Sequence, residues 1–121
     1  MSRKIRIGDA RALEQGLGVS FEFINRADID ASIKGFAVSS GGRVYAYANR
    51  CPHLGVELDW TPGEFFDREA RYLVCSTHGA RFEPETGLCV AGPCSGQSLS
   101  PLRVSVEEGE IYFHDDPAAD F

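Results

Sequence analysis

The order of apolar and polar residues along this chain is typical of short β-strands. Val19, Phe21 and Phe23 alternate with Ser20 and Glu22, so one face of this segment is expected to be buried. Similar patterns predict further strands at residues 5–7, 33–38, 43–49, 72–75, 81–83, 88–90, 102–106 and 110–114. Turn residues separate most of these segments at intervals of about ten residues, which indicates an all-β sandwich or barrel.

Two local signals complete this outline. Residues 9–15 are the only good helical stretch, with Asp9 placed to cap its start and Gly16 placed to end it. Glu108-Gly109 separates the last two strand patterns, which predicts a hairpin. With 121 residues and no linker or repeat, we expect residues 1–121 to form a single domain.

Charge narrows the possible partners. Asp and Glu outnumber Lys and Arg by 18 to 12, and the net charge is −6. Nucleic acids and anionic membrane surfaces both attract clustered basic residues, so neither is an expected partner. No apolar run approaches the roughly 20 residues of a membrane-spanning helix. The N-terminus lacks the apolar segment of a secretory signal, so we expect a cytoplasmic protein with reduced thiols.

Two short motifs carry the candidate chemistry, Cys51-Pro-His53 and Cys75-Ser-Thr-His78. Each contains one cysteine and one histidine, and a glycine follows each motif, at Gly55 and Gly79. The loop between the motifs is easily closed, because loop entropy grows only slowly with length. Two thiols and two imidazoles delivered in this way predict a metal site.

The ligand types leave two metals open. Thiolate and imidazole suit zinc as well as iron–sulfur centres. Zinc fingers, however, place both cysteines together and both histidines on a helix, whereas here each loop contains one of each and precedes a strand. The residues alone therefore favour an iron–sulfur site, with zinc as the alternative.

At these positions the sequence resembles the Rieske family. Cys51-Pro-His53 with Gly55, and the stretch from Cys75 to Phe82, resemble the two cluster-binding loops of that family. The resemblance continues through Thr86-Gly87 and Gly92-Pro93 into the final hairpin, so it covers the chain from about Val44 onward.

The resemblance implies a [2Fe–2S] cluster with two cysteine and two histidine ligands. Cys51 and Cys75 would hold the buried iron, and His53 and His78 the outer one. It also implies an antiparallel sandwich or partial barrel with a small cluster-binding subdomain at about residues 50–95. The positions expected to surround and cover the cluster are Gly55, Gly79, Ala80, Gly92 and Pro93.

Three positions depart from the high-potential members of the family. Those members have an additional cysteine in each loop, forming a disulfide, where this chain has Val56 and Thr77. They also have a serine that hydrogen-bonds the cluster where this chain has Ala80. Fewer donors to the sulfur atoms lower the reduction potential, so the chain resembles the low-potential, ferredoxin-type branch.

The expected function is electron transfer rather than catalysis. The resemblance implies a soluble ferredoxin that passes single electrons from a flavin-dependent or other reductase to an oxygenase or similar redox enzyme. His114 is the only other histidine, so no second iron site of the oxygenase type is available. The alternatives are a small Rieske subunit of a larger oxidoreductase, such as a nitrite reductase, and a redox or iron sensor or zinc-stabilised binding module.

Five further residues have ordinary interpretations. Cys89 and Cys94 lie outside both motifs and are expected to be packing residues or reduced thiols, with a disulfide or a redox-sensing role as the alternative. Trp60, Phe65 and Phe66 are expected to pack in the core or a loop rather than against a cofactor.

Overall fold

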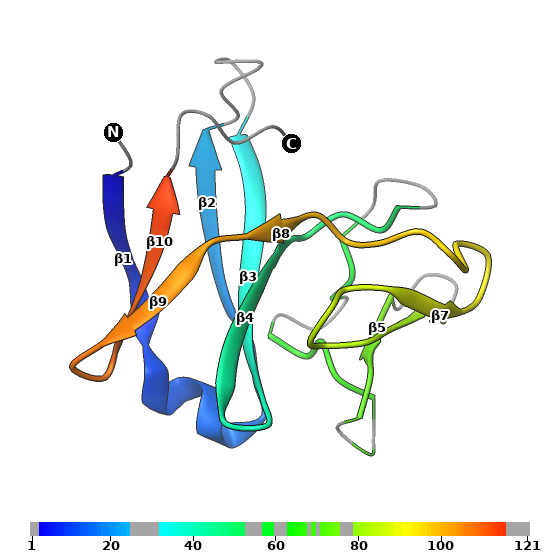
Figure 1. Cartoon of the computed structure of the whole chain (residues 1–121), viewed down its shortest axis with the longest axis horizontal. Helices are drawn as coiled ribbons and strands as arrows, with labels where there is room; N and C mark the ends of the chain where they lie inside the picture. The colour runs from blue at the N-terminus through cyan, green and yellow to red at the C-terminus, as the bar shows by residue number, and fades with distance from the viewer. Residues whose placement is uncertain are drawn as a thin grey trace.

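A computed structural model of the chain describes residues 3–24, 32–52, 57–59, 63–67, 69, 71–75 and 79–115. The described strands are β1 Arg3–Asp9, β2 Val19–Ile24, β3 Ser32–Ser40, β4 Arg43–Ala48, β5 Leu73–Val74, β6 Arg81–Phe82, β7 Cys89–Ala91, β8 Pro101–Leu102, β9 Val104–Glu107 and β10 Glu110–Asp115. All their pairings are antiparallel, which confirms the predicted all-β fold. Figure 1 shows a larger body of strands with a smaller lobe beside it.

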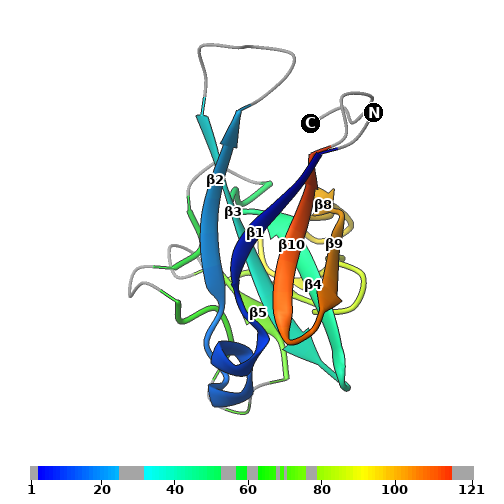
Figure 2. The same cartoon turned by 90° about the vertical axis from the view of Figure 1, so that its left-hand side faces the viewer.

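Three sheets make up these two parts. The strand orders are β1-β10-β9, β2-β3-β4-β8 and β5-β6-β7. Figure 2 shows β2 and β3 on one side of the larger body and β1 and β10 on the other. Phe21 and Phe23 of β2 reach across to Phe113 of β10, with ring centroids 5.2 and 5.0 Å apart. The first two sheets therefore form a sandwich, and the third forms the small lobe.

The buried residues fall into two cores. The first, which we call the sandwich core, consists of Leu13, Phe23, Ile33, Ala37, Ala46, Ala48, Leu102, Ile111 and Phe113. The second, which we call the cysteine core, consists of Phe36, Val38, Tyr47, Cys51, Leu58, Phe65, Leu73, Cys75, Ala80, Phe82, Cys89, Cys94 and Leu99. All four cysteines of the chain belong to the cysteine core.

Strands β3 and β4 separate the two cores. Successive side chains of a strand point to opposite faces. In β3, Ala37 belongs to the sandwich core and Phe36 to the cysteine core; in β4, Ala46 and Tyr47 divide in the same way. Both faces of these two strands are therefore buried, and at these four positions alanines face one core and aromatic rings the other.

Phe65 packs the small lobe against strands β3 and β4. Its ring is fully buried and stacks on Phe36 at 4.1 Å with an interplanar angle of 11°. Gly18 permits this contact, because a Cβ there would lie 2.5 Å from the Phe65 ring. The expected packing role of Phe65 and Phe66 is confirmed, since both belong to or pack against the cysteine core, whereas Trp60 lies outside the described residues.

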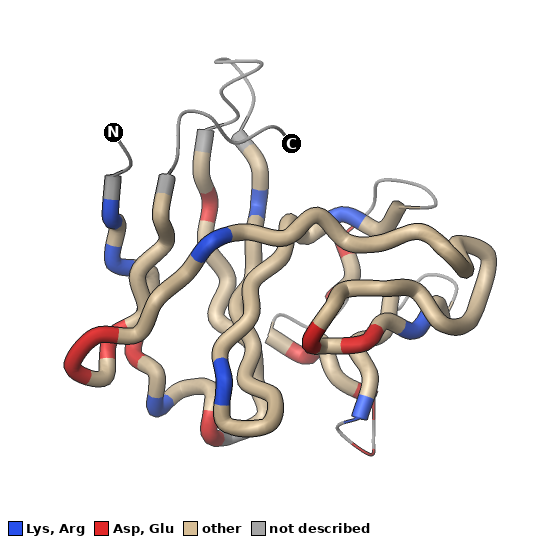
Figure 3. Tube along the Cα trace, in the orientation of Figure 1, with Lys and Arg blue, Asp and Glu red and all other residues tan. Residues whose placement is uncertain are grey.

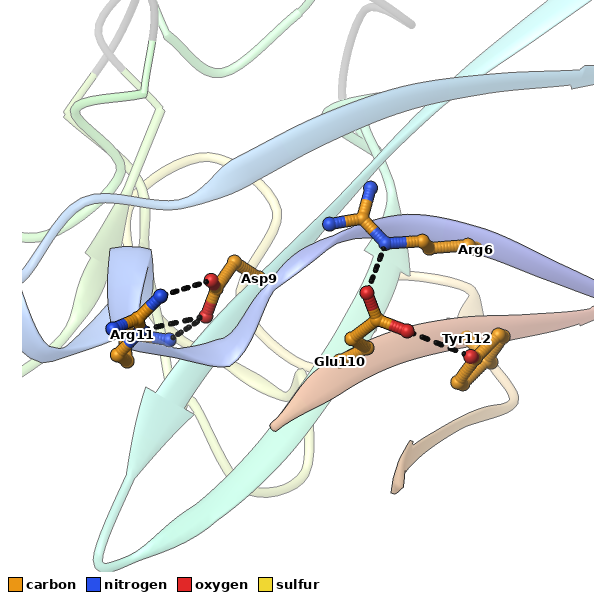
Figure 4. Close-up of polar contacts among 5 residues, drawn as sticks. All are labelled: Arg6, Asp9, Arg11, Glu110 and Tyr112. Carbon is orange, nitrogen blue, oxygen red and sulfur yellow. Dashed lines mark hydrogen bonds and ion pairs between the residues drawn. The ribbon is translucent and has the colours of Figure 1, made fainter. Parts of the chain in front are cut away.

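The predicted N-terminal helix is present as the 3-10 helix η1, Ala10–Gln15. Asp9 caps it by accepting a 2.8 Å hydrogen bond from the backbone N–H of Arg11 (Figure 4). Gly16 ends it with a φ of 79°. At the neighbouring sheet edge, Glu110 accepts hydrogen bonds from Arg6 at 2.7 Å and from the Tyr112 hydroxyl at 2.9 Å. These polar contacts lie outside both cores.

One predicted strand is in fact two. The alternation at residues 102–106 predicts a single strand, but the structure interrupts it at Arg103. Leu102 in β8 pairs with Ala46 of β4, whereas Val104 in β9 pairs with Phe113 of β10. The chain thus passes here from one sheet of the sandwich to the other, which an alternation pattern does not reveal.

Candidate metal centre

The two motif cysteines lie together in the cysteine core. Cys51 follows the end of β4, and Cys75 follows β5 directly. Their exposed fractions are 1% and 0%. No disulfide joins any of the four cysteines, so both side chains are buried thiols. Strands from the sandwich and from the small lobe thus supply one sulfur each.

The loop after Cys75 is closed by its own backbone. The N–H of Cys75 donates to the carbonyl of Ala80 at 2.9 Å, and the N–H of Gly79 donates to the carbonyl of Cys75 at 2.8 Å. Gly79 has a φ of 70°, in the left-handed region that glycine adopts without strain. Between these ends lie residues 76–78, which are outside the described part of the chain. Backbone hydrogen bonds therefore join the described residues on either side of this gap, between β5 and β6.

Asn49 organises the chain that returns from the first motif. Its side chain is 4% exposed, its Oδ1 accepts from the Leu58 N–H at 2.8 Å, and its Nδ2 donates to Asp59 Oδ1 at 2.8 Å. Asp59 Oδ2 in turn accepts from the N–H of Gly63 at 3.1 Å. Sequence reasoning missed this residue, although an asparagine two positions before a ligand-type cysteine was the available signal.

The loop containing Gly92 and Pro93 lies against Ala80, two residues after the second motif. A Cβ on Gly92 would lie 2.8 Å from Ala80 Cα, and Gly92 has a φ of 100°. Only glycine allows this approach, because any side chain would collide with backbone rather than with a flexible group. Ala80 is fully buried beneath it, while Gly92 and Pro93 are exposed.

Cys89 and Cys94 border the same site. Their sulfur atoms are 2.9 Å apart, and the Cys89 thiol donates to the carbonyl of Ala91 at 3.2 Å. Burial, together with the neighbouring Cys89 and Cys51 sulfurs, raises the pKa of the Cys94 thiol to about 12. The expected packing role agrees with the burial of both side chains, at 2% and 1% exposed.

The histidine half of the predicted site lies outside the described residues, as do Gly55, Val56 and Thr77. Among the residues that are described, no group of three or more His, Cys, Asp or Glu side chains is placed to hold a metal ion. The described half fits an iron–sulfur cluster by its chemistry, since two buried thiols in one core are the donors such a cluster requires.

Fold and thiol donors together define the class of protein as an all-β metal-binding domain with loop-borne cysteine ligands. The model of the family described as "Rieske [2Fe-2S] domain" matches residues 7–108. The chain therefore belongs to the Rieske family, whose domain carries a [2Fe–2S] cluster with cysteine and histidine ligands.

Solved structures support this assignment. The ferredoxin of carbazole 1,9a-dioxygenase from Nocardioides aromaticivorans IC177 superposes with a TM-score of 0.71 and 28% sequence identity, over 95% of this chain and 100% of that one. The plasma-membrane Rieske protein of the cyanobacterium Synechocystis PCC 6803 superposes with a TM-score of 0.64 and 18% identity, over 90% of this chain and 97% of that one. At that identity it shows the fold alone. Comparison with curated protein sequences gives no match.

A third structure contains a partner. In a complex of reduced oxygenase and oxidised ferredoxin in carbazole 1,9a-dioxygenase, the matching chain superposes with a TM-score of 0.68 and 21% identity, over 97% of each chain. This likeness also shows the fold. The chain is thus a Rieske domain that resembles ferredoxin electron carriers. No helix among the described residues is long and apolar enough to cross a membrane.

Proposed function

We propose that this protein is a Rieske ferredoxin that passes single electrons from a reductase to an oxygenase or a similar redox enzyme. The observation that carries the proposal is the 28% identical ferredoxin of carbazole 1,9a-dioxygenase, which this chain covers over its full length. When bound, a [2Fe–2S] cluster takes up and releases one electron. The chain itself would supply ligands shielded from water and make or break no substrate bond. The proposal keeps the cytoplasmic location that the sequence predicts.

The proposed ligands are Cys51 and Cys75 for the inner iron and His53 and His78 for the outer one. The burial of both cysteines supports their inner position, because the thiolates of such a site are shielded from water. Gly55, Gly79, Ala80, Gly92 and Pro93 would surround the cluster. Of these, the structure places Gly79 and Ala80 at the end of the second motif and Gly92 against Ala80. This assigns cluster binding to about residues 50–95.

Histidine variants test the ligand assignment. His53→Ala and His78→Ala are expected to lose iron, or to lose the rhombic electron paramagnetic resonance signal of the reduced protein. His114→Ala is the matched control, because His114 lies on β10 and hydrogen-bonds Ser105 at 2.7 Å, away from the cysteine core. A native spectrum in either motif variant would refute the assignment, whatever the protein's function.

A low reduction potential is part of the proposal. Ala80 offers no hydroxyl to the cluster, and its side chain is fully buried beneath Gly92. Ala80→Ser is expected to raise the midpoint potential by roughly 20–60 mV, the equivalent of one hydrogen bond for a one-electron couple. Protein-film voltammetry measures the shift. An unchanged potential in a variant that keeps its iron would show that position 80 does not tune the cluster.

Docking in this proposal uses the uncharged side of the small lobe. Residues 88–102 contain no Lys, Arg, Asp or Glu, and Figure 3 shows this stretch as an uncharged run through β7, around the edge of the small lobe and back to β8. Leu88 and Val90 in it are 38% and 41% exposed. The acidic turn of Glu107 and Glu108 lies at the opposite end of the molecule (Figure 3). An electron-transfer partner could therefore approach the cysteine core without burying a charge of this chain.

The function is tested with anaerobically purified protein. Reductive titration should consume one electron per chain, and the reduced protein should pass that electron to a one-electron acceptor such as cytochrome c. Addition of a ferredoxin reductase and its nicotinamide cofactor should bleach the visible absorption of the cluster. A colourless protein with one zinc per chain would overturn the proposal and favour a zinc-stabilised module.

A further inference from the structure

Two cysteines remain outside the proposed ligand set. Cys89 and Cys94 lie in the cysteine core with their sulfur atoms 2.9 Å apart. Neither forms a disulfide in this structure. A disulfide has a sulfur–sulfur distance of about 2.05 Å, so less than about 1 Å of approach separates the two thiols from a covalent bond.

The backbone already holds the two cysteines in this position. The N–H of Cys89 donates to the carbonyl of Gln97 at 2.8 Å, and the N–H of Gly96 donates to the carbonyl of Cys89 at 3.2 Å. The N–H of Gln97 donates to the carbonyl of Cys94 at 2.9 Å. These bonds close the loop on both sides of the cysteine pair. Bond formation therefore requires rotation of side chains rather than displacement of a strand.

We propose that Cys89 and Cys94 are a second redox site, a dithiol that is oxidised reversibly to an intrachain disulfide. The oxidant is a low-molecular-weight disulfide. One cysteine, as thiolate, attacks a sulfur of the oxidant and releases one thiol; the other cysteine then displaces the second thiol and closes the Cys89–Cys94 bond. Two protons and two electrons leave the cysteine pair and appear on the two released thiols. The couple is therefore a two-electron couple, distinct from the one-electron iron–sulfur centre.

Access to the pair depends on the loop around it. The two side chains are 2% and 1% exposed, but residues 90–93 and 95–98 are all exposed. Exchange therefore proceeds through local opening of this surface loop, and burial protects the closed form from further oxidation. Gly92, which packs against Ala80, lies between the two cysteines. Closing the bond thus acts on the loop that contacts Ala80, just after the second motif.

The sequence provides a direct readout of this chemistry. Trypsin cuts after Arg81 and Arg103, and the peptide 82–103 contains both cysteines and no other. Cys51 and Cys75 fall in separate peptides, 51–68 and 72–81. Holoprotein is equilibrated without oxygen at graded ratios of reduced to oxidised glutathione, quenched with acid, alkylated with N-ethylmaleimide, digested and analysed by mass spectrometry.

The expected result is a peptide 82–103 that is lighter by two hydrogen atoms and unalkylated. Its share should rise from about a tenth to about nine tenths over a roughly hundredfold change in the ratio of squared reduced glutathione to oxidised glutathione. Dithiothreitol should restore the doubly alkylated peptide, and the visible absorption of the cluster should persist throughout.

Two variants complete the test. Cys89→Ala and Cys94→Ala should each leave one thiol in the peptide, which alkylates or carries one glutathione and never gives the lighter form. A wild-type peptide that stays doubly alkylated in fully oxidised glutathione would overturn the proposal. So would a peptide 82–103 cross-linked to peptide 51–68, because Cys94 would then pair with Cys51. The wild-type measurement decides the question even where a variant does not fold.

Discussion

The sandwich core and the cysteine core differ in what holds them together. The sandwich core is made of hydrocarbon side chains between long strands such as β3, which has nine residues. The cysteine core lies beneath β5 and β6, which have two residues each, and contains every cysteine of the chain. Short strands contribute few ladder hydrogen bonds, so the small lobe depends more on its buried thiols and on a few specific contacts. One part is thus a scaffold, and the other is expected to depend on its cluster for stability.

Removal of iron should produce the largest difference in stability between the two cores. Without metal, the buried thiols lose the partner that offsets their charge, and the small lobe should lose stability on the order of several kcal/mol. Hydrogen exchange followed by mass spectrometry should show fast exchange at Val74, Cys75 and Glu83 and slow exchange in β2 and β3. Equally slow exchange in both parts of the apoprotein would show that the lobe folds without its cluster.

Paired aromatic truncations compare the cores directly. Phe65→Ala and Phe113→Ala each remove a ring that is at most 2% exposed, and each should lower the free energy of unfolding by about 3–5 kcal/mol. Only Phe65→Ala should also lower the iron content, because Phe65 stacks on Phe36 in the cysteine core. Denaturant unfolding and iron analysis of both variants test this. Equal iron loss in the two variants would mean that the cores are not independent.

Loss of the Asn49 side chain should lower the stability of the cysteine core by a smaller amount. Asn49→Ala leaves the Leu58 N–H and one bond of Asp59 unmade, which should cost about 1–3 kcal/mol and speed the release of iron. Glu57→Ala is the neighbouring control, because Glu57 is exposed and its ion pair with exposed Lys34, at 3.3 Å, contributes little stability. Iron release to a chelator is the measurement, and equal rates in both variants would contradict the role of Asn49.

Tyr47 should give the smallest effect, visible at alkaline pH. Burial raises the pKa of Tyr47 to about 12 from its ordinary 10.0, and its hydroxyl donates to the Pro84 carbonyl at 2.7 Å. Because the folded state holds this proton more tightly, the stabilisation is complete below pH 10 and declines as the pH rises toward 12. Tyr47→Phe should cost about 1 kcal/mol at neutral pH and lose this decline. Parallel unfolding curves from pH 8 upward, with the same slope in both proteins, would argue against it.

Much of the site was predictable because its chemistry is local in sequence. Cys51 and Cys75 each stand within three residues of a histidine, so the ligand types and their spacing are visible before folding. The sequence offered a pairing of Cys89 with Cys94 only as an alternative, because their contact depends on the backbone bonds of an irregular loop. The role of Asn49 was not predictable, because its partners lie nine and ten positions away and have no pattern of their own.

Some features of the fold were likewise predictable from the sequence, and others were not. Alternation determined most strands and the final hairpin, since a strand with one buried face leaves a period of two in the sequence. It could not show that β3 and β4 are buried on both faces, nor that the strand at residues 101–107 changes sheets at Arg103. Those features depend on which neighbour a strand meets. The sequence by itself thus determined that this is a Rieske domain with two Cys/His loops. The tertiary structure decided that β3 and β4 are shared by two cores. Burial on the second face of a strand requires a packing partner, and only the folded chain supplies one.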